Sequence, residues 1–425
     1  MTTKQRRLLW AILTVGFAVR LGWALYARAK PPFDFYKSGD QFSYYYYGQE
    51  IAKGRGYISY VTHQATAYYP IGFPALLGGI YFVLLHTPFH DDLFIATLLM
   101  NVLLGTASLA LIFVVGRSFG GVRLGLLAAA LMAAFPGVVY QVATLQLETT
   151  FIFCLLVCLA VITDHDWQTG PPTRPRLIAF GAALGVAILV RPFAAVLFLG
   201  LLGALWALRL GWRRTLIAAA TVAGVVLLVS LPWTIRNAME MHAFVPSSTN
   251  MGDTLCLDRN MDAAGGFRFS EHDGCVEPTL PEVERNRGNT RKAIGFVVRH
   301  PRRELLQIAR RARIMFGGDS DGLEAVQALG SGAFLDPGVL RVATWLGDWY
   351  FFGVVGLAIA GLPTFAARRA RPQRLVVLSG LVGLLIIPLL LWGNQRFHLP
   401  LAPFLVLSAG AALIALADRR ASRAT

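Results

Sequence analysis

Long apolar runs recur from end to end of this chain of 425 residues and restrict the folds that are open to it. Hydrophobic residues make up 55% of the sequence and charged residues only 15%, whereas a soluble domain has roughly 25% charged residues. An α-helix needs about 20 apolar residues to cross a bilayer, and several of the runs approach that length. Because the apolar runs are long enough to cross as helices and charged residues are few, the predicted fold class is an all-α polytopic membrane protein.

We predict about ten transmembrane helices within a single domain, residues 1–425. Their approximate ranges are 8–27, 92–116, 122–140, 147–163, 177–190, 193–208, 215–234, 343–362, 375–392 and 398–416. Segment 68–86 is also apolar, but Pro70, Gly72 and Pro74 interrupt it. A crossing there would also reverse the sidedness of every later basic junction, so a re-entrant or interfacial element is expected.

The junctions between the predicted helices alternate in charge. Every second junction is short and basic, with residues such as Lys4, Arg117, Arg174, Arg213, Arg369 and Arg419. Cytoplasmic loops carry the Lys/Arg excess, so both termini are expected in the cytoplasm of a cell-membrane protein. Two long loops, 31–91 and 235–342, then lie outside. Isolated charges at the outer helix ends are candidates for a functional site, because an ionisable group at membrane depth is costly.

The second outer loop contains two further features. Residues 294–316 form a basic amphipathic stretch, which predicts a helix lying on the outer membrane surface. Cys256 and Cys275 are predicted to form a disulfide, since an outer loop meets oxidising conditions; two separate loop thiols are the alternative. The net charge of +15 is dispersed over helix-flanking loops, so no nucleic-acid partner is expected. Neither a metal nor a cofactor is predicted, because no cluster has ligand spacing.

A carboxylate at the start of a helix and several tyrosines distinguish the first outer loop. Asp40 precedes a predicted helix over 41–53, and Tyr44, Tyr57 and Tyr68 follow it. Aromatic faces and phenol hydroxyls suit a site that binds a polyol. The simpler interpretation is that Asp40 caps the helix and the tyrosines form an interfacial belt.

Several short motifs occur in one order along the chain. They are Asp40-x-x-x-Tyr44, Gly54-x-Gly56-Tyr57, Pro70-x-Gly72-Phe73-Pro74, Leu147-Glu148, Arg191-Pro192, Pro232-Trp233-x-x-Arg236-Asn237, His300-Pro301 and Arg396-Phe397-x-x-Pro400. Together they resemble bacterial polyprenyl-phosphate-dependent glycosyltransferases of the GT-C fold, which include mannosyltransferases and aminoarabinose transferases. Two departures stand out: Gln41 follows Asp40 where many relatives have a second acidic residue, and Tyr69 occupies a region where some have a cation.

The resemblance implies transfer of a single sugar, with inversion, from a polyprenyl phosphate to an acceptor glycan, lipid or protein on the extracytoplasmic side. Such a transfer requires a base for the acceptor hydroxyl and cations for the phosphate. Asp40 is the candidate base, and Tyr44, Tyr57 and Tyr68 are candidate sugar contacts. Arg191, Arg236 and Arg396 are candidate phosphate ligands, since arginine binds phosphate in a bidentate manner; snorkelling to the interface is the alternative for each.

Two further residues each have two interpretations. Glu148 begins a span, where a carboxylate either complements the helix dipole or orients the acceptor. His398 is a possible substrate contact, although a structural histidine is the simpler interpretation. Two other functions share this location: a transporter or flippase, and a polymerase or ligase of lipid-linked saccharides. The polar residues gather at one surface and not at mid-membrane, which favours an enzyme over a transporter.

Overall fold

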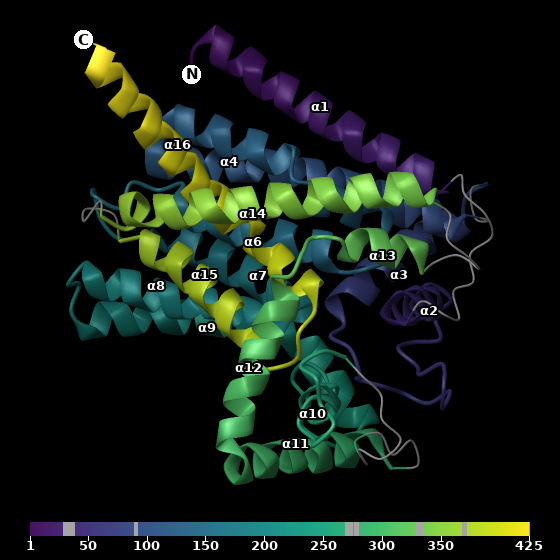
Figure 1. The fold of residues 1–425 in the computed structure, drawn as a ribbon. Helices are drawn as coiled ribbons and strands as arrows, with labels where there is room; N and C mark the ends of the chain where they lie inside the picture. Colours follow the sequence, from purple (N-terminus) through teal and green to yellow (C-terminus); the bar gives the residue numbers. More distant parts are fainter. Residues whose placement is uncertain are drawn as a thin grey trace.

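The computed structural model describes residues 1–28, 39–88, 92–267, 275, 280–328, 335–367 and 372–424, and their regular structure is helical. The elements are α1 (Thr3–Arg28), α2 (Asp40–Ala52), α3 (Gly72–Leu85), α4 (Leu93–Ala133), α5 (Pro136–Tyr140), η2 (Gln141–Ala143), α6 (Glu148–Thr163), α7 (Arg174–Val190), η3 (Pro192–Ala195), α8 (Val196–Ala207), α9 (Trp212–Glu240), α10 (Met251–Leu257), α11 (Glu282–Arg299), α12 (Pro301–Met315), α13 (Asp321–Gln327), α14 (Pro337–Ala367), α15 (Arg374–Leu389), η4 (Gln395–Leu401) and α16 (Ala402–Ala424). The apolar helices pack side by side, both termini lie at one end, and α2, α10 and α13 lie towards the other (Figure 1).

Each of the predicted spans coincides with helical structure. Five helices in the described part of the chain, α1, α4, α9, α14 and the run from η4 into α16, are long and apolar enough to cross a membrane, and shorter apolar helices accompany them. The number of crossings remains a prediction. Spans 92–116 and 122–140 fall largely within the 41-residue α4, which has non-helical backbone at Gly120 and Gly121. A Cβ atom at Gly116 would lie 2.9 Å from Cα of Gly125, so the two halves of α4 pack tightly beyond this turn.

The apolar segment 68–86 contains α3, a helix of 14 residues that packs on α2. At 1.5 Å per residue it is about 21 Å long, shorter than a hydrocarbon core of about 30 Å. A Cβ atom at Gly72 would lie 2.6 Å from the backbone of Leu189 and Val190. Glycine therefore allows the start of α3 to approach the end of α7, which brings the first outer loop next to Arg191.

Arg20 is a buried cation inside the first apolar helix, and the sequence analysis did not identify it. Its guanidinium donates to the carbonyl of Met132 at 3.2 Å and to that of Ala133 at 3.4 Å. These carbonyls belong to the last turn of α4, where a cation complements the helix dipole. Arg20 therefore joins α1 to α4 and has a structural role.

The amphipathic stretch 294–316 is not one helix, as predicted, but parts of two. Helix α11 ends at Arg299 and α12 begins at Pro301, because proline lacks the amide that would continue the helix. In Figure 1 the two helices project from the apolar bundle, and α12 crosses the direction of α14. Arg311 of α12 is fully buried and pairs with Asp258 at 2.5 Å and Glu304 at 2.7 Å. This arginine therefore holds the second outer loop together and does not face lipid.

Candidate active site

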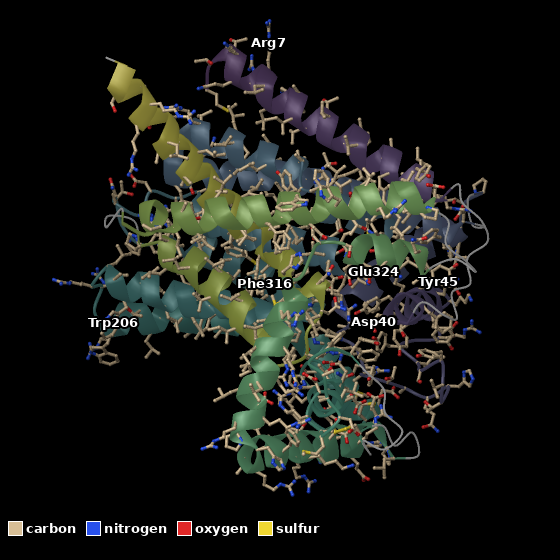
Figure 2. All side chains as sticks on the ribbon, in the orientation of Figure 1. Arg7, Asp40, Tyr45, Trp206, Phe316 and Glu324 are labelled. Atoms are coloured by element: carbon tan, nitrogen blue, oxygen red, sulfur yellow. A yellow bond between two sulfur atoms is a disulfide. The ribbon has the colours of Figure 1, made fainter. Side chains whose placement is uncertain are left out.

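A cavity of about 1280 Å³ lies between the two long loops predicted to lie outside and the adjoining ends of the apolar helices. Asp40, Tyr44, Tyr69, Arg191 and Arg396 are among the residues that line it. Figure 2 places Asp40 where the second outer loop meets the apolar bundle. The volume is ample for the head group of a sugar phosphate together with part of an acceptor, since ligand pockets typically measure about 300–1,000 Å³.

Asp40 is the first residue of α2, and its carboxylate is directed away from the helix. Its Oδ1 accepts from the Tyr69 hydroxyl at 2.6 Å, and its Oδ2 pairs with Arg396 at 2.7 Å. Gly39, with φ of 58°, occupies the N-cap position, and no side-chain cap bond forms. The interpretation of Asp40 as a helix cap is therefore wrong. Burial raises the pKa of Asp40, but Arg396 and the bond from Tyr69 outweigh burial and hold that pKa below its ordinary value.

Arg396 enters the cavity from η4, just before the last long helix. Asn394 caps η4 by accepting from the backbone amide of Arg396 at 2.8 Å. The guanidinium lies over the rings of Trp392 and Phe397, 5.6 and 5.4 Å from their centroids. Aromatic faces on one side and Asp40 on the other therefore fix its direction.

Arg191 and Glu148 form a second ion pair beside the first. Arg191 follows the last residue of α7 in extended conformation, and its Nη2 lies 2.7 Å from Glu148 Oε1. Glu148 begins α6 and is fully buried. Its Oε2 has no hydrogen-bond partner among the described residues. The helix-dipole interpretation of Glu148 is therefore incomplete, because its main contact is a salt bridge.

The three predicted tyrosine contacts have different positions. Tyr44 and Tyr68 line the cavity, but Tyr57 does not. Tyr57 is 3% exposed, and its hydroxyl donates to the backbone carbonyl of Tyr69. Its ring packs at a tilt against Tyr47 and meets Trp233 edge-on. Tyr57 therefore does not face the cavity where a sugar contact was expected, and its hydroxyl instead supports the backbone of Tyr69.

Arg236 is likewise turned away from the cavity. Its guanidinium donates to the carbonyls of Thr66 and Tyr57, both at 2.7 Å, and lies over Trp233. Loop carbonyls outside helices are strong acceptors for the planar guanidinium of an arginine. Arg236, predicted as a phosphate ligand, therefore joins two backbone carbonyls of the first outer loop.

His398 has a protein partner on each of its ring nitrogens. It is fully buried, does not line the cavity, and bonds through its two ring nitrogens to the Met315 carbonyl at 2.6 Å and to Asp319 at 2.9 Å. These bonds hold η4 against the end of α12. His398 therefore anchors the segment that presents Arg396.

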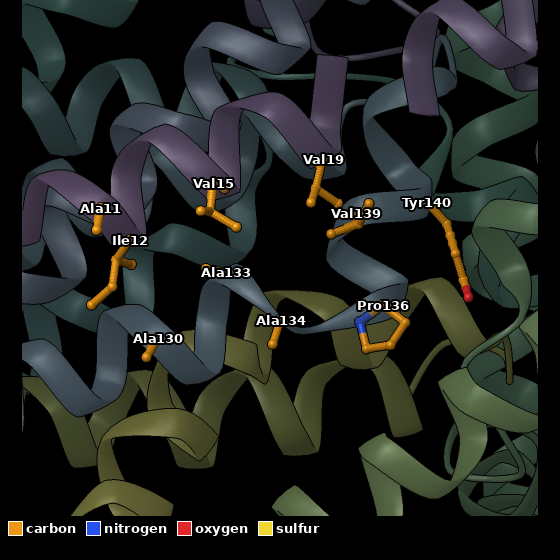
Figure 3. Close-up of a pocket in the computed structure, with 11 residues that line it drawn as sticks. Ala11, Ile12, Val15, Val19, Ala130, Ala133, Ala134, Pro136, Val139 and Tyr140 are labelled. Carbon is orange, nitrogen blue, oxygen red and sulfur yellow. The ribbon is translucent and has the colours of Figure 1, made fainter. Parts of the chain in front are cut away.

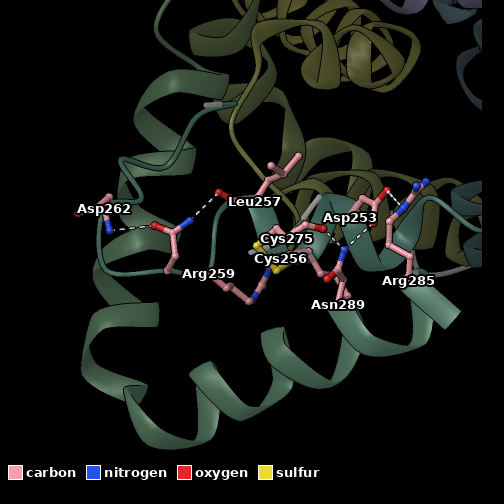
Figure 4. Close-up of a disulfide and its surroundings, with 10 residues drawn as sticks. Asp253, Cys256, Leu257, Arg259, Asp262, Cys275, Arg285 and Asn289 are labelled. Atoms are coloured by element: carbon pink, nitrogen blue, oxygen red, sulfur yellow. Dashed lines mark hydrogen bonds and ion pairs between the residues drawn. A yellow bond between two sulfur atoms is a disulfide. The ribbon is translucent and has the colours of Figure 1, made fainter. Parts of the chain in front are cut away.

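The outer end of the cavity contains a cluster that the sequence analysis missed. Asp253 pairs with Arg285 at 3.2 Å, and Arg285 lies over the ring of Tyr68. Asn289 donates to Asp253 and to the backbone carbonyl of Cys275, which is joined to Cys256 by a disulfide (Figure 4). The predicted disulfide is thus present and supports one wall of the cavity. Nothing in the spacing of these residues marked them as neighbours.

A second cavity, of about 550 Å³, lies between α1 and the α4–α5 junction. Figure 3 shows apolar side chains such as Ile12, Val15 and Val19 facing Ala130 and Pro136 across it. No ionisable side chain except the Tyr140 phenol lines it, so it offers no base and no cation for a transfer reaction. Within the described ranges, no group of three or more His, Cys, Asp or Glu residues has the arrangement of a metal site.

Neither a family model nor a curated protein sequence matches the chain, but solved structures do. The oligosaccharyltransferase of Archaeoglobus fulgidus tethered with an acceptor peptide has a TM-score of 0.54 at 14% identity, covering 97% of this chain and 50% of its own. Its complex with an inhibitory peptide and a dolichol-phosphate gives 0.50 at 13% identity, covering 100% and 52%. ArnT from Cupriavidus metallidurans bound to undecaprenyl phosphate gives 0.43 at 16% identity, covering 97% and 78%.

The present chain thus spans about half the length of the oligosaccharyltransferase whose fold it shares. At these identities the likeness establishes the fold. The predicted all-α GT-C fold is therefore confirmed, whereas the number of crossings and the side on which the two long loops lie remain predictions.

Proposed function

We propose that this chain is a membrane glycosyltransferase that transfers a single sugar from a polyprenyl phosphate to an acceptor on the extracytoplasmic side. The observation that carries the proposal is the group of Asp40, Arg191 and Arg396 in one cavity at the outer ends of the apolar helices. The solved complex of the oligosaccharyltransferase with an inhibitory peptide and a dolichol-phosphate supports a lipid phosphate as the ligand for this fold.

In the proposed reaction, Asp40 accepts the proton of the acceptor hydroxyl while the hydroxyl oxygen bonds to the anomeric carbon. The bond from that carbon to the phosphate oxygen breaks, and its electron pair leaves with the polyprenyl phosphate. Arg396 and Arg191 offset the negative charge that collects on the departing phosphate. A single displacement with one base inverts the anomeric centre.

The cavity walls fit such substrates. Tyr44 and Tyr68 line the part of the cavity proposed for the sugar, and the pair of Asp253 and Arg285 offers hydrogen-bond acceptors and donors to a second polyol. The acceptor is a saccharide, a lipid or a protein, and a polymerase or ligase of lipid-linked glycans would use the same groups. The ion pairs of Asp40 with Arg396 and of Glu148 with Arg191 lie together at one end of the helices. This position favours a transferase, polymerase or ligase over a flippase.

We also infer that the corner between α11 and α12 rests on the outer lipid surface. Ile294, Val298, Leu305 and Leu306 are 57–74% exposed there, and Arg302 is exposed next to them. Exposed apolar side chains rimmed by arginine are typical of helices that lie in the head-group layer. Such a contact would place the cavity at the depth of a lipid-linked phosphate.

The experiment compares the outer glycoconjugates of a deletion strain carrying wild-type protein, Asp40→Asn or no protein, by mass spectrometry. We expect one glycan-modified product to vanish on deletion, return with wild type, and fall about 10²–10⁴-fold in transfer rate with Asp40→Asn, because a base is lost. Near-normal transfer by folded Asp40→Asn would contradict Asp40 as the base. An unchanged glycoconjugate profile after deletion would contradict the proposed glycosyltransferase function.

A further inference from the structure

The two residues that the proposed reaction needs most are bound to each other. Asp40 has to receive a proton and Arg396 has to receive a phosphate, yet Asp40 Oδ2 and Arg396 Nη2 are 2.7 Å apart. We propose that Asp40 and the donor phosphate compete for Arg396, so that arrival of the donor frees Asp40 to act as the base while Tyr69 keeps its carboxylate in position. This inference rests on the proposed function.

The surroundings of Arg396 make an exchange of anions feasible. Arg396 lines the cavity, and its Nε has no hydrogen-bond partner among the described residues, so part of the guanidinium is unused. The groups that face the pair are Tyr69 and Tyr44 on the first outer loop, together with Arg191, Glu148 and Asp321. Arg191 is itself paired with Glu148. A phosphate entering here therefore meets a cation whose existing partner is the candidate base.

The pairing matters for the chemistry, because a carboxylate held by a guanidinium is a weak base. Among the groups around Asp40, Arg396 makes the largest contribution that lowers the pKa of Asp40. A phosphate that draws Arg396 away reduces that contribution, and the pKa of Asp40 then rises towards a value suited to proton transfer. Without donor, Asp40 remains paired and the acceptor hydroxyl is left protonated.

Tyr69 is placed to keep the base oriented during the exchange. Its hydroxyl donates to Asp40 Oδ1, the oxygen that Arg396 does not occupy. Its backbone carbonyl accepts from Tyr57, and its ring packs against Tyr44 at 5.1 Å between centroids. Tyr69 is thus fixed independently of Arg396 and serves as a positioning residue. From the sequence alone, Tyr69 is distinguished only as the residue that occupies a region where some similar proteins have a cation.

Competition is tested by binding of undecaprenyl phosphate to the purified full chain in nanodiscs, by native mass spectrometry. Wild type is compared with Asp40→Asn, Asp40→Ala and Arg396→Ala, and folding of each is checked by thermal unfolding. We expect both Asp40 variants to bind about tenfold more tightly, because the competing anion is gone, and Arg396→Ala to bind more weakly. Asp164→Asn is the matched control and is expected to match wild type, since Asp164 pairs with Arg117 on the exposed surface.

The possible outcomes separate this inference from the proposed function. If folded Asp40 variants bind undecaprenyl phosphate as weakly as wild type or more weakly, the proposed competition is wrong, because Arg396 would then bind the carboxylate and the phosphate at the same time. If wild-type protein has no affinity for undecaprenyl phosphate, the proposed function is contradicted instead, because its donor is a polyprenyl phosphate.

Tyr69 is tested by the pH profile of sugar transfer in membrane vesicles that contain the native donor and acceptor. Tyr69→Phe removes a bond that favours the ionised carboxylate, so the acidic limb of the profile should move to higher pH. An unchanged limb with lower activity at every pH would mean that Tyr69 has only a packing role.

Discussion

Arg191 and Glu148 come from the ends of two neighbouring apolar helices and meet at 2.7 Å in the protein interior. Glu148 is fully buried, so its charge depends on Arg191. Replacing Arg191 by Ala should lower the free energy of unfolding by about 3–5 kcal/mol, because the carboxylate is left buried and unpaired. The double variant Arg191→Met/Glu148→Gln should regain most of this loss. Thermal unfolding in detergent measures both; equal losses in the single and double variants would show that packing, and not charge, dominates.

Arg236 should affect the outer loop and not the donor. Arg236→Ala removes two charge-assisted bonds to backbone carbonyls, so we expect a loss of about 2 kcal/mol in stability and faster proteolysis of the first outer loop. Affinity for undecaprenyl phosphate should stay at the wild-type level. Arg299→Ala, at an exposed position on α11, is the matched control. If Arg236→Ala weakens the affinity for undecaprenyl phosphate and leaves proteolysis unchanged, Arg236 contacts the phosphate after all.

Asp321 should make stability depend on pH. Burial raises the pKa of Asp321 to about 6, and Gln141 donates to its carboxylate. A carboxyl whose pKa is higher in the folded state binds protons better there, so its contribution to stability is lost as pH rises from about 4 to 6. Asp321→Asn cannot ionise and keeps an acceptor oxygen. We expect its unfolding temperature to exceed that of wild type at about pH 7.5 and to approach it at about pH 4.5. An equal difference at both pH values would exclude this ionisation as the cause.

The predicted topology is open to direct labelling in intact cells. Val61 is 65% exposed on the first outer loop, and Asp166 is exposed in the junction after α6. Val61→Cys should react with a membrane-impermeant maleimide, and Asp166→Cys should react only after the membrane is opened. The native thiols Cys154 and Cys158 are buried, which keeps the background low. Labelling of position 166 in intact cells would contradict the predicted sidedness.

Hydropathy was sufficient to predict where the apolar helices lie, because a helix that is apolar over most of its length admits few other structures. Charges isolated at helix ends predicted Asp40, Glu148, Arg191 and Arg396, and these residues do meet. The direction in which each side chain points was not predictable. Tyr57 and Arg236 point away from the cavity because carbonyls of the first outer loop are their partners, and a sequence does not show which loop carbonyls a side chain will reach.

Tyr69 and the pair of Asp253 and Arg285 were missed for a related reason. Tyr69 bonds to Asp40 within the first outer loop, and Asp253 pairs with Arg285 within the second. Such contacts across an irregular loop leave no periodic pattern in the sequence. The break between α11 and α12 was predictable from Pro301 alone, since proline favours the first position of a new helix. The burial of Arg311 was not, because its partner Asp258 lies in a different part of the loop.

The bond between Cys256 and Cys275 also links the construction of the cavity to the chemistry of a compartment. Asn289 joins the Cys275 carbonyl to Asp253, so the disulfide supports the wall that carries Asp253 and Arg285. Under the predicted topology, newly made chain in a reducing compartment lacks this support, whereas chain whose outer loops have been exported acquires it. The predicted topology therefore ties maturation of the cavity to successful translocation, and a molecule inserted upside down would keep two unlinked thiols at this wall.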